Sequence, residues 1–599
     1  MNKSIDGRIM IALLIAMFFF ALKVVLEDIF QDNAINRLLN DDLMRLVQVR
    51  DWLNGKSWFD VSHDRLGVDG TTLHWSRLVD IPIAGLILFF GVFLSPEYAE
   101  LSAVAAWPLI LTFIAIGLIS KIGRLLGGWQ TAIAAIYLGA ILINAGGKFD
   151  TGSLDHHNVQ VVLCLGCLAA ALSSQQSLLV GIIGGVLAAL SLVVGLEALL
   201  YIAIFCFAAA IRWLWFDADR KITTMGFSGA FCLTMILSYV VFQPTAGNSG
   251  FRCDALDIEL LILSATGSFG LFLVTVLFSN QSRAVRTLSL IGLAAAILVV
   301  ALFYAPACLS NPLSQIYPDV QEHWLGEIGE AQPFVSWLID TGKYSEIASL
   351  ILPLVAIVIL IVTIFNRIQV EIHLILLALI LASWTLSMYQ IRAGAFTSMF
   401  MAPVLALLLA NSYQMYRKNK SLRSGLIFIS LLAGLNTSFW AQVLSGLDRE
   451  QNEIQNSAAA TSEADLADVY CFWSDIIANL NEIEPGLIVS GTNFAPYILY
   501  ETDHRVLASN FHRNQDGIQT LIDISWADHE TARDMLVAIN AKYVLSCIGR
   551  GNSWTKGEFA EKENTLWHAI NTENIPDFLE PIDVGTPLLK VFKIVEQGS

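Results

Sequence analysis

Long apolar segments recur along the chain as far as residue 443, and a more polar, mixed pattern follows them. Many of these runs approach about 20 residues, the length that a helix needs to cross roughly 30 Å of hydrocarbon. The pattern predicts a multi-pass α-helical membrane protein with about thirteen spans. The spans are predicted at 9–25, 101–120, 127–146, 157–173, 178–194, 198–214, 225–242, 259–279, 288–304, 349–365, 371–389, 394–411 and 424–443.

The first apolar run predicts the orientation of the chain. It follows Lys3 and Arg8, and no small-x-small cleavage site comes after it. We therefore interpret it as a retained signal anchor with its basic flank inside. An odd number of spans then places the C-terminus outside and the basic run 416–423 inside. The apolar run 80–96 does not fit this count, and we interpret it as a helix buried shallowly in the outer leaflet.

These spans divide the chain into a transmembrane domain over 1–443 and an extracytoplasmic domain over 444–599. Outer loops are predicted at 26–100, 147–156 and 305–348, and both long loops are rich in Asp and Glu. In the tail, helical patterns alternate with apolar strands, which is typical of a small α/β domain with a partly parallel sheet. The strands are predicted within 485–493, 505–511, 541–549 and 586–595.

Composition supports the membrane class and excludes one group of partners. The chain is 55% hydrophobic and 15% charged, with a mean hydropathy of +0.61. Its net charge of −17 is unfavourable for binding nucleic acid, whose phosphates attract Lys and Arg. No basic stripe or aromatic RNA-binding motif stands out. We therefore expect no nucleic-acid partner.

The cysteines indicate the redox environment of the outer loops. Cys253 and Cys308 fall on predicted outer loops and are a candidate disulfide in an oxidising space. Cys471 and Cys547, both in the tail, are a second candidate pair. The remaining four lie in predicted spans and are most simply buried apolar residues.

Acidic residues and a histidine pair on the outer loops suggest metal chemistry. Asp41 lies in the first loop, Asp155 and His157 lie in the second, and Glu327 and Glu330 lie in the third. Carboxylates with an imidazole suit Mg²⁺ or Mn²⁺, and the imidazole favours the softer ion. Outer-loop acids also commonly do no more than solvate a surface. Agreement among loops on one membrane side favours the site.

Four short motifs resemble the catalytic subunit of oligosaccharyltransferase, within the GT-C superfamily of polyprenyl-linked glycosyltransferases. NDDLMRLVQVRD resembles its first-loop motif, with Asp41 as the matching acid. GSLDHH resembles its second-loop motif, with Asp155 at the first acid and His157 where relatives have a carboxylate. EIGEAQP and QIRAGAFTSMFMAP resemble two later motifs, with Glu330 and Arg392 at their functional positions.

The resemblance implies a fold, a cofactor and residue roles. The family has thirteen spans, two long outer loops and a C-terminal outer domain. Asp41, Asp155 and His157 would bind a divalent cation, Mn²⁺ or Mg²⁺, at the phosphate of a polyprenyl-linked sugar. Glu330, together with Asp41, would position or deprotonate the acceptor. Arg392 would bind the donor phosphate.

One family motif is absent. Where oligosaccharyltransferases carry W-W-D-Y-G, which reads an N-x-Ser/Thr acceptor peptide, residues 492–496 read TNFAP. This departure favours a lipid, polysaccharide or other envelope acceptor. The nearby residues His512, Arg513 and Asn514 are candidates for acceptor binding, and a simple polar turn is the alternative interpretation.

The sequence therefore predicts a GT-C glycosyltransferase that transfers a sugar or oligosaccharide from a polyprenyl-phosphate or polyprenyl-pyrophosphate donor. We expect it in a bacterial inner membrane, among membrane lipids, with the C-terminal domain in the periplasm. Protein glycosylation of the oligosaccharyltransferase type is one alternative. A transporter or flippase for polyprenyl-linked glycan is another, but it would favour ionisable residues near mid-membrane, and Glu197 lies near a span end.

Overall fold

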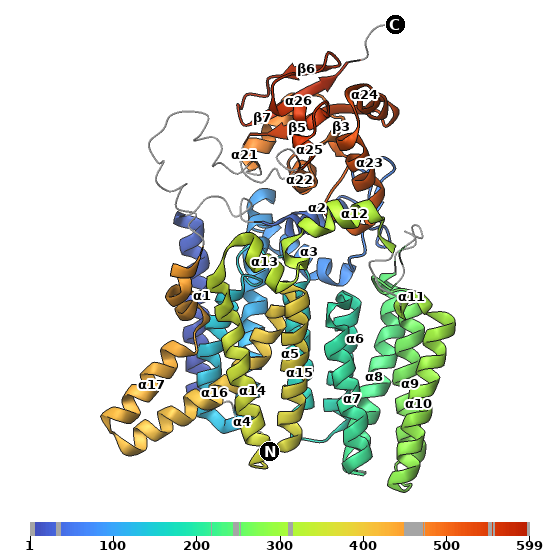
Figure 1. Ribbon diagram of the computed structural model, residues 1–599. Helices are drawn as coiled ribbons and strands as arrows, with labels where there is room; N and C mark the ends of the chain where they lie inside the picture. Colours follow the sequence, from blue (N-terminus) through green and yellow to red (C-terminus); the bar gives the residue numbers. More distant parts are fainter. Residues whose placement is uncertain are drawn as a thin grey trace.

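A computed structural model of the chain describes residues 6–30, 38–216, 218–243, 251, 253–309, 315–448, 471, 474–548, 554 and 558–595. Long helices form a bundle, and a sheet-containing C-terminal region lies over one end of it (Figure 1). The described chain starts toward the opposite end of the bundle. The end of the bundle nearest the C-terminal region is called the outer end below.

Every predicted span overlaps a helix. These helices are α1 (Gly7–Phe30), α4 (Pro96–Gly146), α5 (His157–Ala171), α6 (Leu178–Val194), α7 (Leu199–Phe216), α8 (Ala218–Phe242), α9 (Ile258–Phe278), α10 (Arg283–Tyr304), α14 (Ala348–Phe365), α15 (Val370–Tyr389), α16 (Gly394–Asn419), α17 (Leu422–Gly434) and α18 (Thr437–Leu444). Among the described residues, nine helices are long and apolar enough to cross a membrane, or up to ten if α17 and α18 form one broken span. The multi-pass α-helical fold class is confirmed, and the number of about thirteen spans stays a prediction.

Two predicted spans, 101–120 and 127–146, lie in the single element α4. The helix is interrupted at Gly127 and Gly128, and Gly128 has φ 81°. A positive φ suits glycine, which has no Cβ to clash. The two halves lie against each other, since Ser120 Oγ donates to the carbonyl of Ala132 at 3.4 Å. The glycine pair therefore turns the chain back at one end of the bundle.

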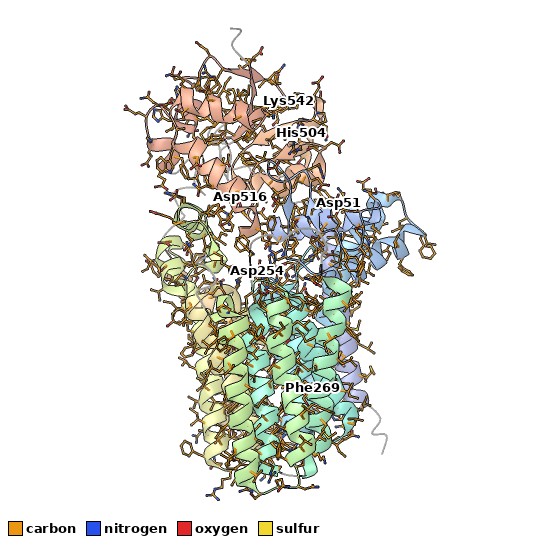
Figure 2. All side chains as sticks on the ribbon, turned by 90° about the vertical axis from the view of Figure 1, so that its right-hand side faces the viewer. Asp51, Asp254, Phe269, His504, Asp516 and Lys542 are labelled. Atoms are coloured by element: carbon orange, nitrogen blue, oxygen red, sulfur yellow. A yellow bond between two sulfur atoms is a disulfide. The ribbon has the colours of Figure 1, made fainter. Side chains whose placement is uncertain are left out.

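Apolar side chains cover the periphery of the bundle. On α9, Phe269 is 52% exposed (Figure 2), and on α10 Phe303 is 77% exposed. A continuous apolar exterior of this kind suits lipid and is rare on proteins surrounded by water. The chain is an integral membrane protein.

The outer end carries the two long loops. The first contains α2 (Asn40–Leu53), β1 (Ser62–His63), β2 (Thr71–Thr72) and α3 (Arg77–Gly91). The third contains α11 (Pro306–Leu309), α12 (Pro318–His323), η4 (Leu325–Glu327), η5 (Gly329–Ala331), α13 (Phe334–Thr341) and η6 (Tyr344–Ile347). The apolar run 80–96 is largely helical as α3, and its depth in the membrane stays a prediction.

The C-terminal region is built around a five-stranded sheet in the order β4-β3-β5-β7-β6. Its strands are β3 (Leu487–Val489), β4 (Arg505–Val506), β5 (Ala541–Cys547), β6 (Leu579–Ile582) and β7 (Leu589–Ile594). β3 is parallel to β4 and β5, whereas β7 is antiparallel to β5 and β6. The predicted partly parallel sheet is confirmed. β6 was not predicted, because it is a short edge strand that contains Pro581.

Helices surround this sheet. They are α21 (Ser474–Ile477), α22 (Ala495–Glu501), α23 (Gln515–Trp526), α24 (His529–Ala538), α25 (Glu558–Glu561) and α26 (Leu566–Asn571). Both candidate disulfides, Cys253–Cys308 and Cys471–Cys547, are present. The boundary at 443/444 lies just before residues outside the described part, and it stays a prediction.

Arginines of the first outer loop fasten the C-terminal region to the bundle. Arg50 Nη1 donates to the carbonyl of Tyr500 at 2.8 Å, and its Nε and Nη2 both reach Glu100 at 2.7 Å. The guanidinium also lies 3.7 Å from the Tyr500 ring centroid. Val506 of β4 donates to the carbonyl of Arg65 at 2.8 Å. The first loop and the C-terminal region therefore pack as one unit over the outer end.

Candidate active site

Asp155 lies between two imidazoles at the start of α5. Its Oδ1 is 2.6 Å from His156 Nδ1, and its Oδ2 is 3.3 Å from His157 Nε2. Both histidines are buried, and their ring centroids are 4.5 Å apart. One potential ligand atom from each of the three residues lies within 4.8 Å of the others. The cluster predicted from the sequence thus has the geometry of a cation site, with His156 as an additional member.

The charges in this cluster are strongly coupled. Burial would raise the pKa of Asp155, but the neighbouring imidazoles His156 and His157 lower it well below its usual value. Burial would lower the pKa of His156, but the carboxylates of Asp155 and Glu197 raise it to about 10. A proton therefore sits between two carboxylates at neutral pH. A divalent cation can take the place of such a proton, so this donor set fits the predicted cofactor.

The first turn of α2 is attached to the same loop. Asp42 Oδ1 accepts hydrogen bonds from the backbone N–H groups of Leu154 and Asp155, at 2.7 Å and 2.8 Å. Burial and the charge of Asp155 raise the pKa of Asp42 to about 7. Asp41, the predicted catalytic acid, precedes it on this turn and is partly exposed. The structure therefore brings the first-loop and second-loop motifs together.

Glu197 is a site residue that the sequence interpretation did not include. It lies in η2 (Leu196–Ala198), between α6 and α7. Its Oε1 is 3.3 Å from His156 Nε2, and its Oε2 accepts from Gln160 Nε2 at 2.9 Å. A Cβ at Gly195 would lie 2.5 Å from Glu197 Oε2, so a larger residue here would displace the Glu197 carboxylate. The available signal was a carboxylate inside a long apolar stretch, which is costly and often functional.

Arg392 lies in η7 (Ile391–Ala393), at the outer start of α16. Its Nε is buried and has no hydrogen-bond partner among the described residues. Its positive charge acts on the Glu197 carboxylate, which connects it to the histidine cluster. Arg392 as a whole is only partly buried, but a buried donor atom without a partner is unfavourable, and an anion could accept from it. This is the arrangement expected of a phosphate-binding arginine.

The third-loop motif lies against Arg392. The backbone N–H of Ile391 donates to the carbonyl of Gln332 at 3.3 Å, so η7 is next to the η5 segment that carries Glu330. The side chains of Glu327 and Glu330 lie outside the described part of the structure. The backbone of the predicted catalytic glutamate is nevertheless adjacent to that of the predicted phosphate ligand.

The predicted acceptor residues are engaged inside the protein. In η11 (His512–Asn514), Arg513 Nε and Nη2 reach the two oxygens of Asp254 at 2.7 Å and 2.8 Å. Asn514 Nδ2 donates to Thr71 Oγ1 at 3.0 Å. His512 Nε2 lies 2.9 Å from Asp254 Oδ2. These contacts join the C-terminal region to the outer loops, and the acceptor-binding role stays a prediction.

The segment 492–496, where the sequon-reading motif is absent, borders the site. It forms η10 (Thr492–Phe494) and the start of α22. Asn493 Oδ1 accepts a hydrogen bond from Asn40 Nδ2 at 2.9 Å. Asn40 immediately precedes Asp41. The C-terminal region therefore contacts the turn that carries the predicted catalytic acid.

Comparisons with known proteins identify the fold. No protein-family model matches the sequence, and no curated protein sequence matches it. Among solved structures, the archaeal oligosaccharyltransferase AglB from Archaeoglobus fulgidus, in complex with an inhibitory peptide and a dolichol-phosphate, matches with a TM-score of 0.65 and 15% identity. The match covers 90% of this chain and 69% of that chain.

Two further structures of the Archaeoglobus fulgidus oligosaccharyltransferase agree. One is tethered to an acceptor peptide containing the NVT sequon and matches with a TM-score of 0.62 and 16% identity, over 90% of this chain and 69% of that chain. The other is a complex with Zn and sulfate and matches with a TM-score of 0.59 and 15% identity, over 90% and 68%. The chain has the fold of this oligosaccharyltransferase, and the resemblance drawn from the motifs is confirmed at the level of fold.

Proposed function

We propose that this chain is an integral-membrane glycosyltransferase. It transfers a sugar or oligosaccharide from a polyprenyl-phosphate or polyprenyl-pyrophosphate donor to a lipid, polysaccharide or other envelope acceptor at the outer face. The observation that carries the proposal is the convergence of the Asp155 cluster, the Asp42 turn and Arg392 from distant parts of the chain. A fold alone does not determine function, so the proposal rests on the chemistry of this site.

Arg392 supports binding of the donor phosphate. A guanidinium presents several donors in a fork that matches phosphate oxygens, and the Nε of Arg392 has no partner among the described residues. The related archaeal structure is in complex with a dolichol-phosphate, which supports a polyprenyl-linked donor here. The position of Arg392, between Glu197 and η5, would hold the phosphate next to the histidine cluster.

Asp155 and His157, with Asp41, would hold the cation, and His156 is an additional candidate ligand. When bound, a divalent cation such as Mn²⁺ or Mg²⁺ stabilises negative charge on the departing phosphate. The archaeal structure in complex with Zn and sulfate supports a metal cofactor here. Asp42 positions the loop, because it accepts two of its backbone N–H groups.

The transfer itself requires a base and an open path to the sugar. The acceptor hydroxyl or amine would lose its proton to the carboxylate of Asp41 or Glu330. Its oxygen or nitrogen would then bond to the anomeric carbon from the face opposite the phosphate. The carbon–oxygen bond to phosphate breaks, and the electron pair leaves on the phosphate oxygen. The anomeric configuration is therefore inverted.

The acceptor surface favours a non-peptide substrate. Residues 492–496 contain no Trp pair and no Asp to bind a sequon hydroxyl, and Asn493 is bonded to Asn40. Glycosylation of protein remains the second candidate, because the archaeal relative has been captured with a sequon peptide. The two candidates differ in the product that cells lose without this protein.

Mass spectrometry of membrane lipids and envelope glycans, in cells with and without the protein, tests the function. We expect the polyprenyl-linked donor to accumulate and one glycan product to disappear. Wild-type protein and the control Asp64→Asn, which changes an exposed acid of the first loop, should restore the product, whereas Asp155→Asn should not. Restoration by Asp155→Asn, or no change in any polyprenyl-linked lipid, would contradict the proposal. A missing glycopeptide would instead favour protein glycosylation.

A further inference from the structure

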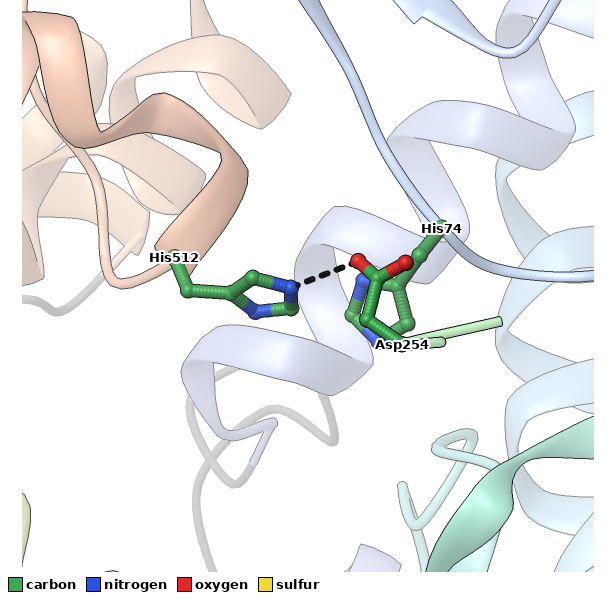
Figure 3. Close-up of side chains that lie close together, drawn as sticks. All are labelled: His74, Asp254 and His512. Atoms are coloured by element: carbon green, nitrogen blue, oxygen red, sulfur yellow. Dashed lines mark hydrogen bonds and ion pairs between the residues drawn. The ribbon is translucent and has the colours of Figure 1, made fainter. Parts of the chain in front are cut away.

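A second group of side chains that suit a metal ion lies where three segments meet. His74 follows β2, Asp254 precedes α9 and His512 begins η11 (Figure 3). One potential ligand atom from each lies within 4.8 Å of the others. Figure 2 shows Asp254 at the junction between the helices and the C-terminal region. We propose that His74, Asp254 and His512 form a zinc site that fastens the C-terminal region to the outer loops.

The donor set favours zinc over the harder cations. Two imidazoles and one carboxylate are ligands that Zn²⁺ accepts, and a water molecule can complete a tetrahedral site. Mg²⁺ and Ca²⁺ prefer oxygen ligands throughout. His512 Nε2 is 2.9 Å from Asp254 Oδ2, and the ring centroids of His74 and His512 are 4.8 Å apart. These separations need only small side-chain movements to enclose one ion.

His74 has an unused ligand atom. Its Nδ1 is buried and has no hydrogen-bond partner among the described residues. A buried polar nitrogen without a partner is unfavourable, and a bound metal ion would remove that cost. An imidazole nitrogen in its neutral form is among the commonest metal ligands in proteins.

Asp254 is already oriented for ligation. Arg513 holds one hydrogen bond to each carboxylate oxygen, at 2.7 Å and 2.8 Å. The adjacent Cys253 is tied to Cys308 by a disulfide, and its backbone N–H donates to Asp257 Oδ2 at 2.5 Å. Carboxylates that bind metals are commonly held by such outer contacts. Because a carboxylate offers about four lone-pair positions, Arg513 leaves room for a metal on Oδ2.

The second site is separate from the Asp155 cluster in its residues, although His156 is close enough for its charge to act on His74. Its role is structural, because its three ligands come from the first loop, the segment before α9 and the C-terminal region. The inference does not depend on glycosyl transfer. Its test therefore measures zinc and not activity.

Zinc content distinguishes the two sites. The double variant Asp155→Asn/His157→Gln removes the first cluster and is the background for all measurements. The full chain is purified in detergent with a tag free of histidine, stripped with chelator, dialysed against zinc sulfate and analysed by mass spectrometry for bound metal. We expect about one zinc ion per chain in the background, lost when His74→Gln or His512→Gln is added. Co²⁺ loaded into the background should give the visible absorption of a site with nitrogen and oxygen ligands.

Two further variants keep the result interpretable. His529→Gln changes a histidine of the same region whose Nε2 contacts the carbonyl of Thr565 at 3.2 Å, and it should retain the zinc. His74→Cys supplies a thiolate and should also retain it, which separates loss of a ligand from loss of folding. Zinc should raise the melting temperature of the background and leave that of the His74→Gln variant unchanged. A background chain that binds no zinc, or zinc retained in both glutamine variants, would overturn the proposal.

Discussion

Two aspartates at the outer end are both shielded from solvent, but their partners differ in kind. The Asp80 side chain is 0% exposed and accepts hydrogen bonds from Arg45 Nη1 and Arg77 Nη1, each at 3.1 Å, and from Gln48 Nε2 at 2.6 Å. The Asp155 side chain is 13% exposed and is partnered by two imidazoles. The first carboxylate is held by permanently charged arginines, and the second by groups that can exchange a proton for a metal.

The side chains around Asp80 and Asp155 show how a structural buried charge differs from a functional one. Around Asp80 the cations have other protein contacts: Arg45 lies 4.4 Å from the Trp75 ring centroid, and Arg77 also donates to the carbonyl of Gln48 at 3.2 Å. Near Asp155, the Nε of Arg392 is buried without a partner among the described residues. Unpartnered donors occur in both places, because Arg45 Nε and Nη2 beside Asp80 are also buried without a partner among the described residues. The kind of partner around each carboxylate, and not a missing hydrogen bond, therefore distinguishes the two clusters.

The largest effect is expected from Asp155→Asn. Asparagine keeps the size of the side chain and still accepts the backbone N–H of His156, but it cannot supply the charge that would hold a cation. Sugar transfer should fall on the order of 10⁴-fold, equivalent to about 5 kcal/mol of barrier. Melting in detergent should change little. Transfer assays with the isolated polyprenyl-linked donor measure the loss, and near-normal transfer would remove Asp155 from the site.

The reverse result is expected for Asp80→Asn. It leaves Arg45 and Arg77 buried without their carboxylate, which should lower the free energy of unfolding by about 3–5 kcal/mol. Transfer per folded molecule should stay within about threefold of the wild type, since this part of α3 holds no proposed ligand. Thermal melting measures the loss of stability, and transfer rates normalised to folded protein measure the activity. A stable Asp80→Asn chain with poor transfer would show that Asp80 has a functional role and not a structural one.

Arg392→Gln should have an intermediate effect that is confined to the donor. Loss of charge-assisted hydrogen bonds to phosphate should raise the KM for donor about 10- to 100-fold, the equivalent of about 1.5–3 kcal/mol. Arg392→Lys should raise the KM for donor less than Arg392→Gln does, because lysine keeps the charge but lacks the forked donors of arginine. The KM for acceptor is the internal control. If it rises as much as that for donor, Arg392 does not bind the phosphate.

The smallest effect concerns pH. His63 is 3% exposed, and burial and the charges of Lys56 and Arg77 lower its pKa to about 3. The unfolded chain takes up this proton near pH 6.5, so the stability from neutral His63 is complete above that value. It is lost as pH falls, by about 1.4 kcal/mol per unit between about 6 and 4.

His63→Gln should remove this part of the pH dependence. Melting temperatures of both proteins at pH 7, 6 and 5 measure it, and transfer per folded molecule should be the same in both. Identical slopes would show that His63 does not titrate with folding. A change in transfer would move His63 from the structural class to the functional one.

The helices could be predicted because long apolar runs leave few alternatives in a membrane. The exception is instructive: the run 424–443 is broken into α17 and α18, which are bent by 79°. Asn436 caps α18, because its side chain accepts the N–H of Ser438. Gly434 and Asn436 were visible signals for this break. Their effect was hidden by the apolar residues on both sides.

The site was predictable only where its residues lie within short motifs. Asp155 and His157 were predicted in this way, and the resemblance drew attention to His157 and away from His156. His156 lies just before α5, and Glu197 lies between α6 and α7, so their contact joins segments about 40 residues apart. No local sequence pattern contains such a contact. Asp41 and Asp42 are adjacent in the sequence, and their positions on α2 decide which side chain is buried. Asp42 is buried, whereas Asp41 is partly exposed. Tertiary structure supplies that information.

The disulfide beside Asp254 has a consequence for how the protein must be made. Cys253 precedes α9 and Cys308 follows α10, so the bond can close only after both helices have been made and their outer ends have come together. A chain produced where thiols stay reduced would lack the Cys253–Cys308 bond next to Asp254. The C-terminal region, which contacts Asp254 through Arg513, would then pack on a less constrained segment. Recombinant production therefore belongs in a host that exports and oxidises the outer loops.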